Sequence, residues 1–161
     1  MGSRTPPIPM ANPFEGSFEV ESNGDAVTYP SVLQYHVVKK GGTDELIMPL
    51  AAADCPEPAT VPGPRGFNIE GIAQFDALIG EWVGVRYFGV TWAWASENIS
   101  RDAPIDAVST AAAATNGRMR QIDVGTVIAA GQMIAGIALE NGAEDELFKV
   151  FLTRQVQVAL A

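Results

Sequence analysis

The stretch of the chain that most constrains its fold lies near the C-terminus, between residues 121 and 152. Two apolar runs, 133–139 and 147–152, flank an acidic segment that contains the pair Asn141-Gly142. Asn and Gly tolerate the positive φ angles that hairpin turns require. The second run alternates between a face with Phe148, Val150 and Leu152 and a face with Leu147, Lys149, Phe151 and Thr153. This period of two predicts a strand with a buried face, and the whole stretch predicts a β-hairpin.

Length and charged fraction limit the architecture. At 161 residues the chain is one domain, or one domain with a long extension. Only 18% of the residues are charged, against about a quarter in an ordinary globular domain. Two interpretations stay open: much of the surface contacts partners, or the chain is a β-rich protein with many Thr, Gly and Ala residues.

The charge balance argues against nucleic acid as a direct partner. The net charge is -9 and the sequence pI is about 4.4, whereas a nucleic-acid-binding face needs clustered Lys and Arg. The tight basic pairs are Lys39-Lys40 and Arg118/Arg120. No apolar run reaches the ~20 residues of a membrane span, and residues 1–14 have no apolar core of a signal peptide. We expect no nucleic-acid and no membrane partner.

Motifs of catalysis and cofactor binding are missing from the sequence. We find no phosphate-binding glycine loop, zinc-ligand spacing or calcium-binding loop. Cys55 is the single cysteine, so an intrachain disulfide is excluded and synthesis in a reducing cytoplasm is expected. Asp54 and Glu57 flank it, which disfavours a reactive thiolate. The single histidine, His36, has a structural role in our interpretation. Spacing leaves a Ser-His-Asp triad open, but Gly-x-Ser-x-Gly is absent; we expect no enzyme, no metal and no cofactor.

The first sixteen residues form an extended, Pro-rich arm in our interpretation. Four prolines remove backbone donors and favour extended geometry: Pro6, Pro7, Pro9 and Pro13. The alternative is a disordered tail, in part a cloning remnant. On the arm interpretation, apolar side chains anchor it on a neighbouring subunit. The candidate capsid or subunit interface residues are Ile8, Met10, Phe14 and Phe18.

Residues 17–161 form one β domain in our prediction, with an internal boundary open in the Pro-rich loop 51–71. Residues 17–50 predict two hairpins. The first joins the runs 18–21 and 26–29 through a turn at 23–24. The second joins the runs 31–38 and 45–50 through a turn at 39–42. The spacing of Ile72, Phe75 and Ile79 predicts a short helix over 72–80. Further strands are expected at 105–108, 118–122 and 154–161. The fold class is therefore mainly β: a small antiparallel β-barrel or sandwich with a β-rich N-terminal extension and the arm.

An aromatic stretch occupies residues 81–95. As a single strand it places Trp82, Trp92 and Trp94 on one face. One wall of the barrel core is the favoured interpretation. A platform for sugars and a subunit interface, where Trp is enriched, are the alternatives.

The C-terminal hairpin also resembles a known family. Gly136-Ile137-Ala138-Leu139-Glu140 is followed by the turn 141–146 and the strand 147–152, and "DAPIDAV" and "NGRMRQI" precede it. The pattern is similar to that of bacteriophage capsid decoration (cement) proteins, over roughly residues 83 to 153. Arg101-Asp102-Ala103-Pro104 stands where the family has a glycine, and the N-terminal half shows no family motif.

The resemblance implies a structural virion protein. Such proteins bind the major capsid protein on the outer surface of the expanded capsid and stabilise the shell as symmetric oligomers, often homotrimers. The alternative function is a carbohydrate- or receptor-binding β-module that uses the Trp-rich strand, and a hydrolase ranks below both.

Overall fold

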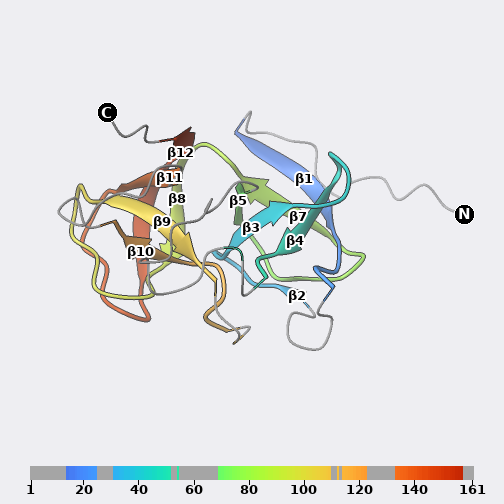
Figure 1. The fold of residues 1–161 in the computed structure, drawn as a ribbon, viewed down its shortest axis with the longest axis horizontal. Helices are drawn as coiled ribbons and strands as arrows, with labels where there is room; N and C mark the ends of the chain where they lie inside the picture. The colour runs from blue at the N-terminus through green and yellow to red at the C-terminus, as the bar shows by residue number, and fades with distance from the viewer. Residues whose placement is uncertain are drawn as a thin grey trace, which may run out of the picture.

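The computed structural model describes residues 14–24, 31–51, 54, 69–109, 112, 114–122 and 133–157. These residues form twelve strands in three sheets and no helix (Figure 1). The predicted mainly-β fold with a small barrel is therefore confirmed. Accordingly, the described residues hold no helix that is long and apolar enough to cross a membrane.

A closed five-stranded barrel is formed by strands from the first half of the chain. Its order is β1 (Glu15–Val20), β4 (Leu46–Pro49), β3 (Val37–Lys40), β5 (Ile69–Ala73) and β7 (Trp82–Arg86). β1 closes the barrel, because it pairs antiparallel with β7 and parallel with β4. Alternation buries one face of each strand, so Val20, Ile47, Val83 and Val85 fill the barrel core. Residues 15 and 16, which we expected in the arm, begin β1.

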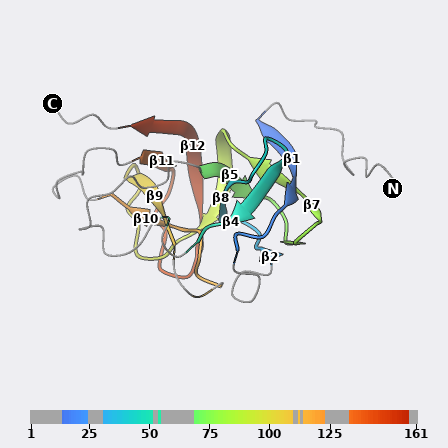
Figure 2. The same cartoon turned by 45° about the vertical axis from the view of Figure 1, so that its right-hand side comes forward.

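A second five-stranded sheet follows in the chain, and we call it the C-terminal sheet. Its order is β10 (Arg118–Gln121), β9 (Pro104–Val108), β11 (Met133–Ala138), β12 (Leu147–Gln157) and β8 (Gly89–Trp94). The sheet curls, since Ala95 just after β8 forms a bridge with Met119 of β10. A two-stranded sheet of β2 (Ser31–Val32) and β6 (Ala77–Leu78) completes the fold. The barrel and the C-terminal sheet lie side by side in both views (Figures 1 and 2).

β11 and β12 pair as the β-hairpin that the sequence pattern predicts, so this prediction is confirmed. Phe148, Val150 and Leu152 are buried as expected. Gly136 allows the close pairing of the two strands, because a Cβ there would lie 2.3 Å from the carbonyl oxygen of Phe151. β9 and β10 also occupy the predicted places. β12 runs on to Gln157, so the residues expected to begin a separate strand at 154 continue this one, and residues 158–161 lie outside the described part.

Two predictions for the middle of the chain were wrong. Residues 72–80 form the end of β5 and then β6, not a helix: Ile72 is fully buried, whereas Phe75 and Ile79 are exposed, so these residues share no face. Residues 81–95 form two strands, because Gly89 adopts a φ of 87° after β7. The tryptophans are not a wall of the core, which is built instead by the alternate residues of β7 and β8.

The hairpins predicted in residues 17–50 are confirmed in part. β3 and β4 pair antiparallel, but the preceding run is broken at Tyr35, whose φ is 61°. β1 pairs with β4 and β7, and its expected partner 26–29 lies outside the described residues. The core is continuous between the two sheets, since Val37 and Ile72 of the barrel pack in one cluster with Phe148.

Candidate interaction surface on the C-terminal sheet

The face of the C-terminal sheet that points away from its core is unusually apolar. Four large apolar side chains on it are well exposed: Val90 (47%), Trp92 (38%), Ile137 (41%) and Leu147 (38%). Together with the half-buried Phe151 they define what we call the outer face. Scattered exposed apolar residues are ordinary, but a contiguous set marks an interaction surface.

The strand register makes this set contiguous. Val90 on β8 lies opposite Phe151 on β12, which lies opposite Ile137 on β11. Two residues further along β8, Trp92 faces Lys149, and two residues beyond that Trp94 faces Leu147. Directly opposed residues have Cβ atoms about 5 Å apart. The outer face is therefore a largely apolar band across three neighbouring strands, interrupted by the exposed Lys149 between Leu147 and Phe151.

Burial of the opposite face explains why these side chains are left outside. The alternate residues of the same strands, among them Ala93, Ala138 and Val150, are fully buried in the core. Because successive side chains of a strand point to opposite faces, the core assignment fixes the outer face.

Phe14 borders the outer face through aromatic contacts. Its ring centroid lies 5.0 Å from that of Phe88, and Phe88 packs edge-on against Phe151 at 5.5 Å. Both separations fall within the range of favourable aromatic pairs. Phe14 is itself 43% exposed. The residue from which the chain continues toward its N-terminus thus lies at one end of the outer face.

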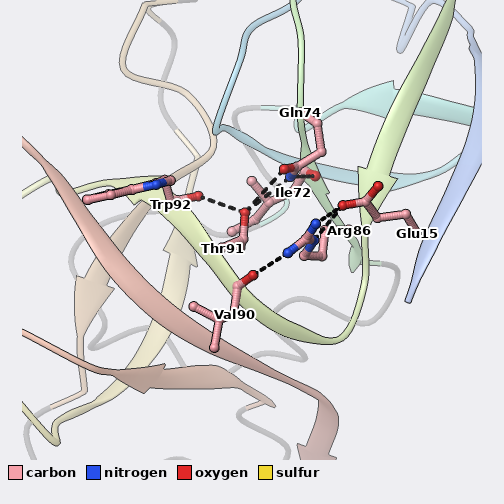
Figure 3. A network of polar contacts seen from close by, with 7 residues as sticks. All are labelled: Glu15, Ile72, Gln74, Arg86, Val90, Thr91 and Trp92. Atoms are coloured by element: carbon pink, nitrogen blue, oxygen red, sulfur yellow. Dashed lines mark hydrogen bonds and ion pairs between the residues drawn. The ribbon is translucent and has the colours of Figure 1, made fainter. Parts of the chain in front are cut away.

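A polar network beneath this corner holds β1, β7 and β8 together (Figure 3). The Arg86 guanidinium donates to the Glu15 carboxylate, at 2.6 Å from Nε, and to the carbonyl of Val90 at 2.5 Å. A second guanidinium nitrogen is ion-paired with the same carboxylate. The Gln74 amide donates to the Thr91 hydroxyl at 3.2 Å. These bonds fix the first residue of β1 relative to the first residues of β8.

The three predicted tryptophans are divided between two sheets. Trp82 begins β7 in the barrel, whereas Trp92 and Trp94 lie on the same side of β8. The Lys149 ammonium lies 5.1 Å from the ring centroid of Trp92, and the Arg118 guanidinium 5.7 Å from that of Trp94. These are cation–π distances. The proposed sugar platform of three tryptophans is thus reduced to two, each with a cation against its ring.

The predicted interface residues other than Phe14 are not seen on the outer face. Phe18 lies on β1 and packs against the barrel core, away from the band that Phe14 borders. Ile8 and Met10 lie outside the described residues. Sequence reasoning missed Val90, Ile137 and Leu147. The period of two had placed Leu147 and Phe151 on one face, but their exposure depends on which face packs against the core.

His36 occupies a buried position at the junction of the two sheets. Its ring nitrogens lie 2.9 Å from the carbonyl oxygen of Gln34 and 3.3 Å from that of Ala114. Burial lowers the pKa of the imidazole below its ordinary value. Its ring lies 6.4 Å from that of Trp94. Burial outweighs the two carbonyl contacts, which favour the protonated ring. Within the described part of the chain no three His, Cys, Asp or Glu side chains gather as metal ligands would.

A cleft of about 370 Å³ lies between the barrel and the C-terminal sheet. Its walls come from β3 and β5 on one side and from β10, β11 and β12 on the other. The lining is mixed: aliphatic side chains such as Ile69, Ile72 and Leu152 lie beside Glu70, Tyr87 and Thr153, which contribute a carboxylate, a phenol and a hydroxyl.

The fold has a counterpart among solved structures. It is similar to the head fiber gp8.5 N base in bacteriophage phi29, with a TM-score of 0.52 and 14% sequence identity. The match covers 89% of this chain and 96% of that chain. At this identity the likeness shows a shared fold. No protein-family model matches the sequence, and no curated protein matches it either.

Proposed function

We propose that this chain is a structural protein of a phage head that binds the outer surface of the expanded capsid and stabilises it. The observation that carries the proposal is the fold shared with the base of a phage head fiber, which extends over 89% of this chain. The resemblance of residues 83–153 to capsid decoration proteins supports the same class from a separate source, the sequence pattern.

The outer face supports a role in assembly rather than in catalysis. It exposes Val90, Trp92, Ile137 and Leu147 to solvent, and such a band needs a macromolecular partner more than a small substrate. On this proposal the chain acts as a symmetric oligomer, most simply a homotrimer. Its partners are the major capsid protein and neighbouring copies, which the arm residues Ile8, Met10 and Phe14 contact.

Stabilisation of the shell then follows from mass action. A protein that binds the expanded shell and not its dissociated or unexpanded forms shifts the equilibrium toward the expanded shell. Many copies on a symmetric lattice add avidity, because each bound oligomer holds several capsid subunits at once. The net charge of -9 suits a position on the outside of the shell, away from the packaged DNA.

Co-sedimentation with expanded, undecorated capsids of the source virus tests the proposal. We expect saturable binding at a fixed number of copies per shell and no binding to unexpanded shells. A variant without residues 1–13 should bind more weakly while giving an unchanged circular dichroism spectrum. Absence of sedimented protein at micromolar concentration would refute capsid binding.

A carbohydrate- or receptor-binding module is the second candidate. The 38% exposure of Trp92 favours it, since an exposed indole can stack on a sugar ring. The cation of Lys149 over that ring and the distant location of Trp82 weaken the platform. Titration of Trp fluorescence with glycans decides: quenching that saturates supports the module, and an unchanged spectrum refutes it.

A further inference from the structure

The cleft between the barrel and the C-terminal sheet has the size of a small-molecule site. Its volume of about 370 Å³ lies within the range of roughly 300–1,000 Å³ that ligand pockets occupy. We propose that this cleft binds an organic ammonium ion, a protonated aliphatic amine whose charge meets Glu70 and whose hydrocarbon chain packs on the apolar wall. This inference goes beyond capsid binding, and the isolated protein tests it whether or not the chain binds a capsid.

The barrel wall of the cleft contains an irregularity in strand pairing. Val38 and Lys39 are adjacent on β3, but they lie opposite Gly71 and Ile69, which are two residues apart on β5. Glu70, between these two, is therefore an extra residue in the ladder. Extra residues of this kind turn a side chain out of the regular alternation, and they are frequent beside functional sites. The shift in register thus accounts for a carboxylate at the wall of the cleft.

The opposite wall is irregular in the same way. Two residue steps along β11, 134–136, correspond to four along β12, 152–156. Ala135 and Thr153 lie within this shift, and both line the cleft. The Thr153 hydroxyl is shielded from solvent and has no hydrogen-bond partner, whereas buried hydroxyls normally have one. Each wall therefore brings an irregular strand segment and a polar side chain to the cleft.

The charge of Glu70 selects a cation. In the part of the chain that the structure describes, its carboxylate makes no hydrogen bond or ion pair. Both neighbouring lysines are paired elsewhere: Lys39 Nζ lies 2.7 Å from the Asp54 carboxylate, and Lys40 is ion-paired with Asp44 and attracts Glu70 only at longer range. Because the whole chain also carries a net charge of -9, an anionic ligand is disfavoured here and a cationic one is favoured.

The aliphatic part of the lining selects a cation with a hydrocarbon chain. Val37 and Ile72 of the barrel and Met119 and Leu152 of the C-terminal sheet line the cleft and belong to one core cluster. A hydrated inorganic cation would gain nothing from these side chains, and no group of three metal-ligating side chains is found among the described residues. A hydrocarbon chain is stabilised there by removal of apolar surface from water. The combination fits an aliphatic ammonium ion.

An NMR titration of the full-length protein tests the proposal. Uniformly ¹⁵N-labelled protein is titrated with n-pentylammonium, and n-pentanoate and n-pentanol serve as ligands of similar length with a negative charge and with no charge. We expect saturable shifts of the amide signals of Gly71, Ala135 and Thr153 with pentylammonium. Pentanoate and pentanol should bind at least about tenfold more weakly, since neither can form a charge-assisted hydrogen bond as donor to the carboxylate.

Two variants locate the charge that the ligand meets. Glu70→Gln keeps the shape of the side chain and should raise the Kd for pentylammonium at least about tenfold. Glu45→Gln removes an exposed carboxylate of the barrel that does not line the cleft, and it should leave the Kd within about twofold of wild type.

A lysine side chain of a partner protein would present the same ammonium chain as a free amine. Nα-acetyl-lysine N-methylamide distinguishes the two sources: binding tighter than that of pentylammonium assigns the site to a lysine side chain, and weaker binding assigns it to a free amine. Either result supports an ammonium site.

Four outcomes overturn the proposal. They are the absence of saturable shifts at tens of millimolar pentylammonium, shifts spread over the acidic surface, equal affinity for pentanoate, and wild-type affinity in Glu70→Gln. The comparison of pentylammonium with pentanoate uses the wild-type protein, so it decides the question even if Glu70→Gln does not fold.

Discussion

The contact between Arg86 and Glu15 gives the most quantitative prediction, because it joins the first strand to the corner beneath the outer face. Arg86 donates to Glu15 and also to the carbonyl of Val90. A Lys in its place would supply one point charge and could not reproduce the planar set of donors. We therefore consider Arg86→Met, Glu15→Gln and the two together.

The magnitude follows from the exposure of the pair. The two side chains are 25% and 28% exposed. Fully exposed ion pairs couple by about 0.2–1 kcal/mol, whereas removal of one partner from a buried pair costs about 3–5 kcal/mol. We expect a coupling energy of about 1–2 kcal/mol between these limits. Arg86→Met alone should cost about 1 kcal/mol more than Glu15→Gln, because it also leaves the Val90 carbonyl without this donor.

Urea unfolding of the four proteins measures these terms. A double-mutant cycle subtracts the effects of each substitution elsewhere and leaves the coupling energy. The expected loss is a large fraction of the ~5–15 kcal/mol that stabilises a typical domain. A coupling energy below about 0.3 kcal/mol would refute the view that this pair fixes the position of β1.

Three further predictions follow from the core and its junction. Gly136→Ala should destabilise the protein by about 2 kcal/mol or more in urea unfolding, since the new Cβ would lie 2.3 Å from a backbone oxygen; wild-type stability would contradict the tight pairing of β11 and β12. Phe148→Ala should cost about 3–5 kcal/mol, because the ring is fully buried, and a loss below about 1 kcal/mol would place it outside the core. His36 has a lowered pKa in the folded protein, so the unfolded chain takes up the proton first and stability should fall as the pH drops below 6.5. The urea midpoint of the wild-type protein should therefore be lower at pH 5.5 than at pH 7.5, and this decrease should be smaller in His36→Gln. An equal decrease in the wild-type protein and in His36→Gln would argue against the burial effect.

The parts of the fold that the sequence predicts are those set by local patterns. The hairpin around Asn141-Gly142 combines period-two burial with a turn that tolerates positive φ, and both signals lie within twenty residues. The β3–β4 hairpin has the same character. By contrast, barrel closure requires β1 to pair with β7, which lies more than sixty residues further along the chain. No local pattern encodes that pairing.

The two wrong predictions for the middle of the chain, residues 72–80 and 81–95, have definite physical reasons. The 81–95 stretch contains Gly84 and Gly89, and only the second adopts a positive φ that ends one strand and begins the next. Gly84 remains within β7. The spacing of Ile72 and Phe75 suits a helix face, but Ile72 lies opposite Val37 in the barrel, and this tertiary pairing outweighs the weak local preference.

The candidate site was predicted only in pieces. Phe14 and Trp92 were each singled out for their chemistry, yet they belong to the same region only because Phe88 and Phe151 lie between them. Val90 and Ile137 carry no sign of a surface role in the sequence pattern alone. An apolar residue in a strand signals burial by default, and its exposure becomes visible only when the sheet's other face is assigned to the core.

Electron cryomicroscopy of expanded, undecorated capsids saturated with the full-length protein tests whether this chain binds the outside of the shell. We expect density for this two-sheet fold on the outer surface, at positions related by the symmetry of the shell and with copies in contact with one another. Shells without added density on their outer surface, after incubation at micromolar protein, would contradict it.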